Sequence, residues 1–168
     1  PMVWMNKFDP KQTILHMKKG TVFMGVPTLY TRMLAEASLD KKATRHMRLF
    51  ISGSAPMLAE THAAWKAATG HAILERYGMS ETVMLTSNPC KPDVRFNGSS
   101  ERRGGTVGFA LPGVSLRVVD EANQPVALGE VGAIQVKGPN VFLGYWQMPE
   151  KTAEEFTTDG FFKTGDVG

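Results

Sequence analysis

The sequence is poor in cysteine and has no long apolar run. Its 168 residues include one cysteine, Cys90, which excludes an internal disulfide and a cysteine-based zinc cluster. No stretch approaches the ~20 consecutive apolar residues that a membrane helix needs, and no segment resembles a secretion signal. We therefore expect a protein without a membrane span, working in a reducing, cytoplasmic compartment.

Common catalytic motifs are also missing. The sequence contains neither a GxxxxGK[ST] phosphate loop nor an HExxH zinc motif. Its histidines lack an acid and a nucleophile at a spacing typical of a catalytic triad. These absences argue against the P-loop and zinc-peptidase classes, and we expect the histidines to be structural or exposed.

Basic residues exceed acidic residues by a small margin. The chain has 19 Lys and Arg against 16 Asp and Glu, a net charge of +3, and these residues are scattered along it. Binding of nucleic acid usually uses a basic stripe or patch on one face. We therefore expect no nucleic-acid partner, and small anionic ligands are favoured instead.

The first 90 residues alternate between helix and strand patterns. Three short apolar stretches, TVFMGV, HMRLFIS and HAILERY, have the composition of buried strands. Asp9 and Pro10 begin a helical segment that Gly20 ends, and residues 28–37 and 57–69 also have helical patterns. The alternation predicts a parallel α/β sheet whose first strand is buried on both faces.

Each of these strands is followed by a loop with small or polar residues. The loops contain VPT, SGSAP and YGMSE. In an open parallel sheet the carboxyl ends of the strands share one edge, and ligands bind there. We therefore expect the three loops to lie side by side and to form a ligand site.

The pattern changes near residue 90. Residues 86–105 are rich in Ser, Asn, Pro, Gly and Arg, which predicts a loop. Two strands, a short helix and a hairpin are then expected, at 115–120, 132–138, 149–156 and 159–166. We expect part of an α/β subdomain at 1–90 and a linker with a β-rich subdomain at 91–168.

Five segments resemble the adenylate-forming acyl-CoA synthetases, in order and in spacing. They are RLFISGSAP, ERYGMSE, VGFALPGVSLRVVD, KGPNVFLGYW and DGFFKTGD, and the resemblance covers essentially the whole chain. Within that family, VPTLYTR and GPNVFLGYWQMPEKT are most similar to the malonyl-CoA synthetases. The resemblance implies a fragment of the large N-terminal domain of an adenylate-forming enzyme, with a parallel-sheet α/β part followed by a β-rich, distorted-barrel part.

The resemblance also implies an activity. Enzymes of this family activate a carboxylic acid with ATP and Mg²⁺ and pass the acyl group to coenzyme A, so ATP/AMP, Mg²⁺ and CoA are the expected cofactors. The expected acid is small, malonate or methylmalonate. The family's phosphate-gripping loop and its C-terminal lysine have no counterpart in this sequence. We therefore expect an excerpt that is inactive without the missing N-terminal and C-terminal parts of the enzyme.

The segment ERYGMSE carries most of the implied nucleotide contacts. Tyr77 offers an aromatic face to adenine, and Gly78 lets the backbone approach the nucleotide. Ser80, in place of the family's usual threonine, offers a hydroxyl to a phosphate oxygen, and Glu81 is an oxygen ligand suited to Mg²⁺. Ser80 and Glu81 are the expected catalytic residues. Asp166, in TGD, would bind the ribose hydroxyls through its two carboxylate oxygens.

Other implied contacts lie in the loops that follow the strands. The complete nucleotide-binding set is Gly53, Ser54, Ala55, Glu75, Arg76, Tyr77, Gly78, Met79, Ser80 and Asp166. For the acid, malonyl-specific relatives carry an arginine after VPTLYT, where this chain has Arg32, and Ser54 matches its hydroxyl partner. A second carboxylate needs such a cation when it is buried. On spacing alone, an arginine that lies along a helix surface is the alternative.

Three other functions stay open. A medium-chain or aromatic acyl-CoA synthetase shares the chemistry and would have an apolar pocket around Arg32. A carrier-protein-loading adenylation domain differs in the acceptor thiol, whose binding residues lie largely in the missing domain. A nucleotide-binding fragment without catalysis is an alternative of another class.

Overall fold

The chain divides into two compact units in the computed structural model, which describes residues 2–92, 94 and 98–168. Unit 1 comprises Pro1–Tyr77 and Thr86–Phe109, and unit 2 comprises Gly78–Leu85 and Ala110–Gly168. The expected boundary at residue 90 therefore falls inside unit 1, because the chain leaves this unit after Tyr77 and returns at Thr86. No helix in the described residues has the length and apolar character needed to cross a membrane.

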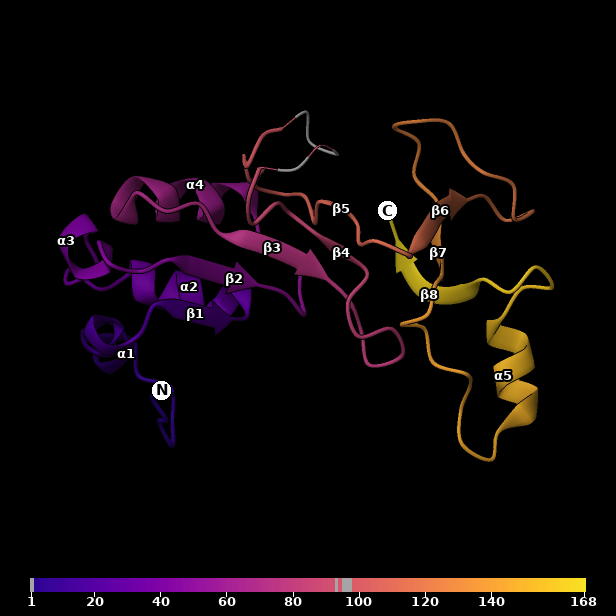
Figure 1. The fold of residues 1–168 in the computed structure, drawn as a ribbon, viewed down its shortest axis with the longest axis horizontal. Helices are drawn as coiled ribbons and strands as arrows, with labels where there is room; N and C mark the ends of the chain where they lie inside the picture. Colours follow the sequence, from indigo (N-terminus) through magenta and orange to yellow (C-terminus); the bar gives the residue numbers. More distant parts are fainter. Residues whose placement is uncertain (1, 93, 95–97) are drawn as a thin grey trace. The chain divides into compact units, whose positions relative to one another are not determined.

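Unit 1 combines helices with a sheet of short strands (Figure 1). Its elements are α1 (Pro10–His16), the 3₁₀ turn η1 (Met17–Lys19), β1 (Val22–Gly25), α2 (Pro27–Leu34), α3 (Lys41–Thr44), β2 (Leu49–Ser52), α4 (Ala59–Thr69), β3 (Leu74–Tyr77) and β4 (Thr86–Ser87). Local signals set the helix ends. The Asp9 carboxylate accepts the N–H of Gln12 at 2.8 Å before Pro10 begins α1, and α4 ends at Gly70 with φ 79°.

Strands β1, β2 and β3 are adjacent and parallel, as predicted. Gly25 is in register with Ser52, and Ser52 is in register with Glu75. The carboxyl ends of the three strands therefore meet at one edge of the sheet. This edge is the place where an open α/β sheet binds ligands.

The sheet continues with two short strands that the composition does not predict. β4 lies in the segment 86–105, which has the composition of a loop, and it runs antiparallel to β3 with Tyr77 opposite Thr86. The strand order is β1-β2-β3-β4-β5, where β5 is Phe109–Ala110. Two residues are too few for a recognisable apolar period, so pairing with β3 decides this strand.

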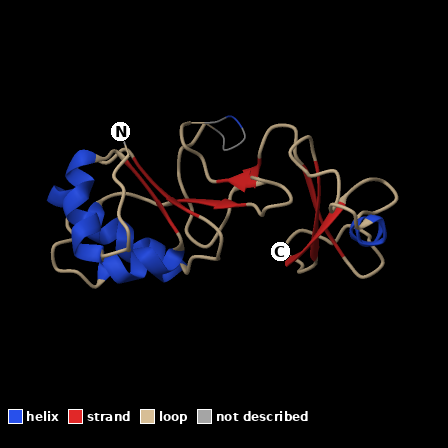
Figure 2. Cartoon of the chain, turned by 90° about the horizontal axis from the view of Figure 1, so that it is seen from below, coloured by secondary structure: helices blue, strands red, loops and turns tan. Residues whose placement is uncertain are grey.

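The helices of unit 1 lie on one side of its strands (Figure 2), and the main core lies between the two layers. Phe50 of β2, Tyr30 of α2 and Trp65 of α4 are each 0% exposed. The Trp65 ring makes edge contacts with Tyr30 and Phe50 at centroid distances of 4.8 and 5.0 Å. Burial of such large apolar surfaces is the dominant stabilising contribution in this unit.

The prediction that the first strand is buried on both faces is wrong. Val22 is 40% exposed and Met24 is 60% exposed. Phe23, between them, points to the opposite face and contacts Tyr30 at a ring distance of 5.5 Å. β1 is the edge strand of the sheet, and the helices cover one of its faces, so its apolar composition does not translate into burial on both.

Unit 2 is rich in β-structure, as predicted. Its antiparallel sheet has the order β6-β7-β8, formed by β6 (Ser115–Val119), β7 (Ala133–Lys137) and β8 (Phe162–Val167), and the helix α5 (Pro149–Glu155) precedes β8. The hairpin predicted at 159–166 is partly right. A turn precedes β8, but a single bridge between Phe156 and Phe162 closes it, and the main partner of β8 is β7.

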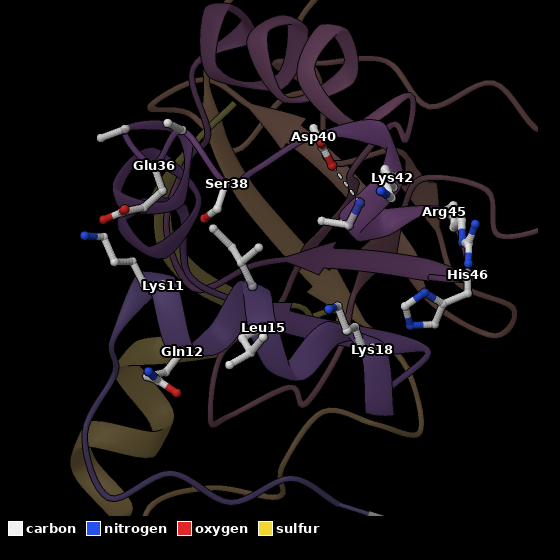
Figure 3. Close-up of a pocket in the computed structure, with 14 residues that line it drawn as sticks. Lys11, Gln12, Leu15, Lys18, Glu36, Ser38, Asp40, Lys42, Arg45 and His46 are labelled. Atoms are coloured by element: carbon white, nitrogen blue, oxygen red, sulfur yellow. Dashed lines mark hydrogen bonds between the residues drawn. The ribbon is translucent and has the colours of Figure 1, made fainter.

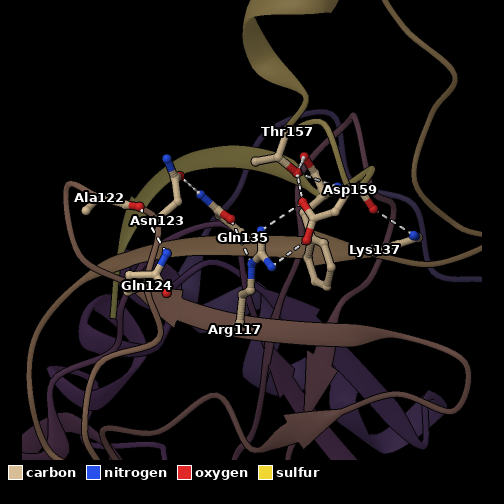
Figure 4. Close-up of polar contacts among 9 residues, drawn as sticks. Arg117, Ala122, Asn123, Gln124, Gln135, Lys137, Thr157 and Asp159 are labelled. Carbon is tan, nitrogen blue, oxygen red and sulfur yellow. Dashed lines mark hydrogen bonds and ion pairs between the residues drawn. The ribbon is translucent and has the colours of Figure 1, made fainter.

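A chain of polar contacts joins the sheet of unit 2 to its turns (Figure 4). Arg117 on β6 donates to both carboxylate oxygens of Asp159, at 2.7 and 3.1 Å, and to the amide oxygen of Gln135 on β7 at 2.9 Å. Gln135 is 2% exposed and donates to Asn123 at 2.6 Å. The Thr157 hydroxyl donates to Asp159 at 2.6 Å. The network ties the turn after β6 and the turn before β8 to the sheet.

Candidate nucleotide and acyl site

The loop after β2 carries the predicted contacts Gly53, Ser54 and Ala55. Ser54 is exposed and has φ 67°, a left-handed conformation that is uncommon for a serine. A side chain at Gly53 would be crowded, because an added Cβ would lie 3.3 Å from the carbonyl oxygen of Arg76. The loop thus presents an exposed hydroxyl from strained backbone, a feature that clusters at ligand sites.

Glu75 on β3 is buried inside unit 1. Its side chain is 5% exposed, and its carboxylate accepts the N–H of Gly105 at 3.3 Å. Burial raises the pKa of this carboxyl, and backbone hydrogen bonds from Gly105 and Met57 oppose the rise. The carboxylate therefore links the segments at Gly105 and Met57 to β3. A nucleotide contact from Glu75 stays a prediction.

Arg76 and Tyr77, the last residues of β3, are half-buried. Arg76 lies opposite Ser87 of β4, and its guanidinium nitrogen Nη2 lies 3.5 Å from the sulfur of Met24. Tyr77 lies opposite Thr86 of β4. The pairing with β4 therefore determines where the Tyr77 ring leaves the sheet.

Arg32 lies in the last turn of α2, the helix that follows the carboxyl end of β1. It is exposed, and its guanidinium carbon lies 4.8 Å from the centre of the Phe8 ring. Within the described part of the chain, no carboxylate pairs with it. The Phe8 face holds the cation by a cation–π contact and leaves its hydrogen-bond donors available to an anion.

Gly78 opens the short loop of unit 2 that carries Ser80 and Glu81. A Cβ added to Gly78 would lie 2.2 Å from the carbonyl oxygen of Val83, so the loop folds back on itself at this residue. The buried hydroxyl oxygen of Thr82 accepts the N–H of Met79 at 3.3 Å. The glycine is therefore required by the loop itself, in addition to the predicted approach to a nucleotide. Ser80 is exposed at the tip.

Glu81 is half-buried, and a second segment of unit 2 holds it. The hydroxyl of Tyr145 donates to its carboxylate oxygen Oε1 at 3.3 Å, and the N–H of Phe142 donates to its main-chain oxygen at 2.8 Å. Loss of solvent contact and the negative charge of Glu81 raise the pKa of Tyr145. The phenol thus stays protonated and acts as a donor.

Sequence reasoning missed the residues that hold this loop. Asn140 donates through Nδ2 to the carbonyl oxygens of Thr82 and Met84, at 2.7 and 2.9 Å. Asn140 and Tyr145 both belong to GPNVFLGYW, which contributes only to the family resemblance. The sequence does show that Asn140 and Tyr145 are hydrogen-bonding side chains among aromatic residues. It does not show which residues they bond.

Asp166 is exposed on β8, after Gly165, whose φ is 78°. Its N–H donates to the hydroxyl oxygen of Thr164 at 3.2 Å. The structure therefore brings together Gly53 and Arg76 in unit 1, and it places Ser80, Glu81 and Asp166 in unit 2. The ligand roles of all these residues stay predictions.

A pocket in unit 1 lies apart from the predicted contacts (Figure 3). Its basic lining residues include Lys11, Lys18, Lys42, Arg45 and His46. They belong to α1, α3 and the adjoining turns, whereas the predicted contacts follow the carboxyl ends of the strands. None of the predicted site residues lines this pocket.

The described residues offer a magnesium ion one predicted ligand, the carboxylate of Glu81. In residues 2–92, 94 and 98–168, no group of three or more His, Cys, Asp and Glu side chains could hold a metal. Magnesium usually binds through one or two carboxylates together with substrate phosphates. The single carboxylate of Glu81 fits that mode of binding.

The strand ends of this parallel sheet carry glycine, a strained serine and an aromatic residue. Open α/β folds bind ligands at this edge of the sheet. The chain belongs to the AMP-binding enzyme family, whose family model matches residues 1–146. Its fold is that of the N-terminal domain of adenylate-forming enzymes, as predicted.

Similar proteins cover both units. A malonate–CoA ligase of Arabidopsis thaliana is 44% identical over 156 residues, spanning 88% of this chain and 24% of that protein. A human mitochondrial malonate–CoA ligase is 36% identical over 201 residues, spanning 98% of this chain and 34% of that protein. The crystal structure of ATP-bound MatB from Rhodopseudomonas palustris is 58% identical with a TM-score of 0.90, covering 98% of this chain and 31% of that one.

A malonyl-CoA ligase with methylmalonyl-CoA and AMP bound is 42% identical, with a TM-score of 0.80 over 96% of this chain and 34% of that one. The chain thus spans about a quarter to a third of the length of the proteins it matches. Three of these proteins are CoA ligases by name. ATP is bound in the MatB structure, and AMP and methylmalonyl-CoA are bound in the malonyl-CoA ligase structure.

Proposed function

We propose that the chain is part of an ATP-dependent acyl-CoA synthetase that activates malonate or methylmalonate and transfers the acyl group to coenzyme A. The observation that carries this proposal is the 44% identity to the malonate–CoA ligase of Arabidopsis thaliana over 88% of the chain. The 42% identity to a malonyl-CoA ligase with methylmalonyl-CoA and AMP bound supports it. The exposed cation of Arg32, in the last turn of the helix that follows β1, supports a substrate with a second negative charge.

In this reaction the acid attacks the α-phosphorus of ATP and pyrophosphate leaves. The thiol of CoA then attacks the acyl carbon of the adenylate, and AMP leaves as the thioester forms. Tyr77 would stack on adenine, Asp166 would accept hydrogen bonds from the ribose hydroxyls, and Ser80 would donate its hydroxyl to a phosphate oxygen. Fixed donors of this kind stabilise the charge of the transition state because they need no reorganisation during the reaction.

Glu81 is the residue that would hold magnesium. When bound, the ion would neutralise charge on the phosphate oxygens. The contribution of this chain is to keep the carboxylate half-buried and directed, through the fold of its loop and the hydroxyl of Tyr145. A fixed carboxylate loses less entropy on binding than a mobile one.

Arg32 would select the acid. It would pair with the distal carboxylate of malonate, with the Ser54 hydroxyl as a second donor. A hydrogen bond to a charged group contributes about 1.5–3 kcal/mol. Because Arg32 is exposed, this range applies rather than the larger figure for a buried ion pair.

Activity of the full-length protein tests the proposal. Arg32→Ala should lower kcat/KM for malonate by roughly one to two orders of magnitude, at ~1.4 kcal/mol per decade. Butyrate, which has no second charge, should lose little. The measurement is adenylate formation with both acids for the wild type and the variant, and Arg45→Ala, which lies on the basic pocket instead, is the matched control.

The outcomes separate the alternatives. If the Arg32→Ala variant melts normally and loses kcat/KM equally for malonate and butyrate, Arg32 does not select the substrate. If the wild type prefers a medium-chain or aromatic acid, that acid is the substrate and malonate is not. Transfer to a carrier protein but not to CoA would indicate a carrier-loading domain, and binding of ATP without adenylation of any acid would indicate a non-catalytic fragment.

Two further points belong to this proposal. The chain by itself is expected to be inactive, since it spans about a third of its longer relatives. A cytoplasmic location stays a prediction, and the human relative named as mitochondrial makes cell fractionation the deciding measurement.

A further inference from the structure

We propose that Tyr145 is a positioning residue for Glu81, whose phenol hydroxyl orients the carboxylate toward a magnesium–ATP complex. The inference rests on the proposed function and adds a residue that the family resemblance assigns no role. Both residues lie in unit 2, so the geometry is that of a single compact unit.

The contact joins two segments far apart in the sequence. The Tyr145 hydroxyl donates to Oε1 of Glu81 at 3.3 Å. A carboxylate on a flexible side chain can present either oxygen in many directions, and a donor on one oxygen limits that freedom. With Oε1 held by Tyr145, Oε2 is the oxygen that we expect to face the metal.

Three contacts hold Tyr145 in place. Its N–H donates to the Thr152 hydroxyl of α5 at 2.9 Å, and its ring makes an edge contact with Phe142 at a centroid distance of 4.8 Å. The Lys151 ammonium lies 4.8 Å from the centre of the same ring. A donor that is held by packing and by a hydrogen bond can impose its geometry on Glu81.

The loop that carries Glu81 is held in a strained form by the same segment. Val83 has φ 57°, which is a true outlier for a β-branched residue. Asn140 bonds the carbonyl oxygens on both sides of it, those of Thr82 and Met84. Strained backbone that is stabilised from outside in this way is typical of a functional loop.

These contacts have two separate roles. Asn140 and the N–H of Phe142 hold the backbone of the loop, whereas the hydroxyl of Tyr145 contacts the Glu81 carboxylate. Loss of the Tyr145 hydroxyl should therefore leave the loop folded and free the carboxylate. Such partners of a metal ligand typically change metal affinity by 10-fold or more when they are removed.

The test uses Tyr145→Phe in the full-length protein, with ATP binding measured by calorimetry over a magnesium titration. Without magnesium, the variant should bind ATP as the wild type does. With magnesium, the variant should need a magnesium concentration about tenfold higher for half of the maximal increase in ATP affinity. Steady-state adenylation should show the same rise in the magnesium requirement, with kcat at saturating magnesium nearly unchanged.

Two controls show whether Tyr145→Phe acts through the Glu81 carboxylate. Trp146→Phe changes the neighbouring side chain, which is 86% exposed, and should leave the magnesium requirement unchanged. In a Glu81→Gln background, Tyr145→Phe should add no further change, because the carboxylate that it orients is gone. Thermal melting of each variant reports on folding.

The inference is overturned if Tyr145→Phe has the magnesium requirement of the wild type, or if it has the same effect with and without the Glu81 carboxylate. A wild type that shows no magnesium-dependent ATP binding would overturn the proposed function as well. The two failures are distinguishable, since the first leaves magnesium-dependent binding intact in the wild type.

Discussion

Unit 1 and unit 2 are stabilised by different interactions. In the described part of unit 1, a cluster of ten buried apolar side chains that includes Trp65 lies between the helices and the sheet, and a second cluster has three. The described part of unit 2 has four buried apolar side chains: Leu85, Val119, Val136 and Phe162. Its sheet and turns are joined instead by the polar chain that runs through Arg117 and Gln135.

The difference bears on how each unit holds its predicted ligand groups. Unit 1 presents residues at the ends of strands whose positions follow from a packed core, so moderate changes at its surface should be tolerated. Unit 2 presents Glu81 from a loop that depends on individual hydrogen bonds from Asn140, Phe142 and Tyr145. Its geometry is therefore sensitive to single polar substitutions.

The largest expected effect tests the core of unit 1. Trp65→Ala removes a side chain that is 0% exposed and should lower the free energy of unfolding by about 3–5 kcal/mol. Hydrogen exchange should show loss of protection for β2 and α4, while β6, β7 and β8 keep theirs. Trp146→Ala, at a side chain that is 86% exposed, is the matched control and should change stability by less than about 0.5 kcal/mol. Equal loss of protection in both units would contradict the comparison.

An intermediate effect compares one strained residue in each unit. Ser54 has φ 67° and Val83 has φ 57°, and a left-handed conformation costs a non-glycine residue roughly 1–2 kcal/mol. At each site the glycine variant should be more stable than the alanine variant by about 1 kcal/mol, because part of the relief is offset by the greater chain entropy of unfolded glycine. Chemical denaturation of the four variants measures the difference. Alanine variants as stable as the glycine variants would mean that neither loop is strained.

The smallest expected effect is a pH dependence in unit 2. The hydrogen bonds from Arg117 and Thr157 lower the pKa of Asp159 from 3.8 to about 2. A carboxyl whose pKa is lower in the folded state stabilises the protein above its ordinary pKa, and this contribution disappears as the pH falls from about 4 to about 2. Because the Asp159 side chain is exposed to solvent, the change should be small.

Asp159→Asn should therefore be less stable than the wild type at pH 6, and the difference should shrink as the pH approaches 2. Urea denaturation at several pH values measures it. Glu121→Gln, in the exposed turn after β6, is the control for the loss of a surface charge. A difference that is constant across this pH range would show that the Arg117 pair does not stabilise unit 2.

Much of the fold follows from local sequence. Asp9, Pro10 and Gly70 mark helix ends through contacts within a few residues, and the apolar stretches that form β2 and β3 are found where predicted. The parallel order and the shared edge at Gly25, Ser52 and Glu75 follow from the alternation of helices and strands. These features need no knowledge of distant partners.

Other features of the fold depend on contacts with residues that are distant in the sequence. β4 exists because Thr86 and Ser87 pair with β3, and the excursion of Gly78–Leu85 into unit 2 depends on bonds from Asn140. The exposure of β1 depends on its place at the edge of the sheet.

The sequence by itself determined the family, the α/β and β-rich parts, and the residues predicted to contact the nucleotide and the acid. Only the tertiary structure decided that Glu75 is buried and that Tyr145 reaches Glu81. The physical reason is the range of the interactions. Helix caps and strand patterns act over a few residues, whereas the donor for Glu81 lies 64 residues away and is found only when the chain is folded.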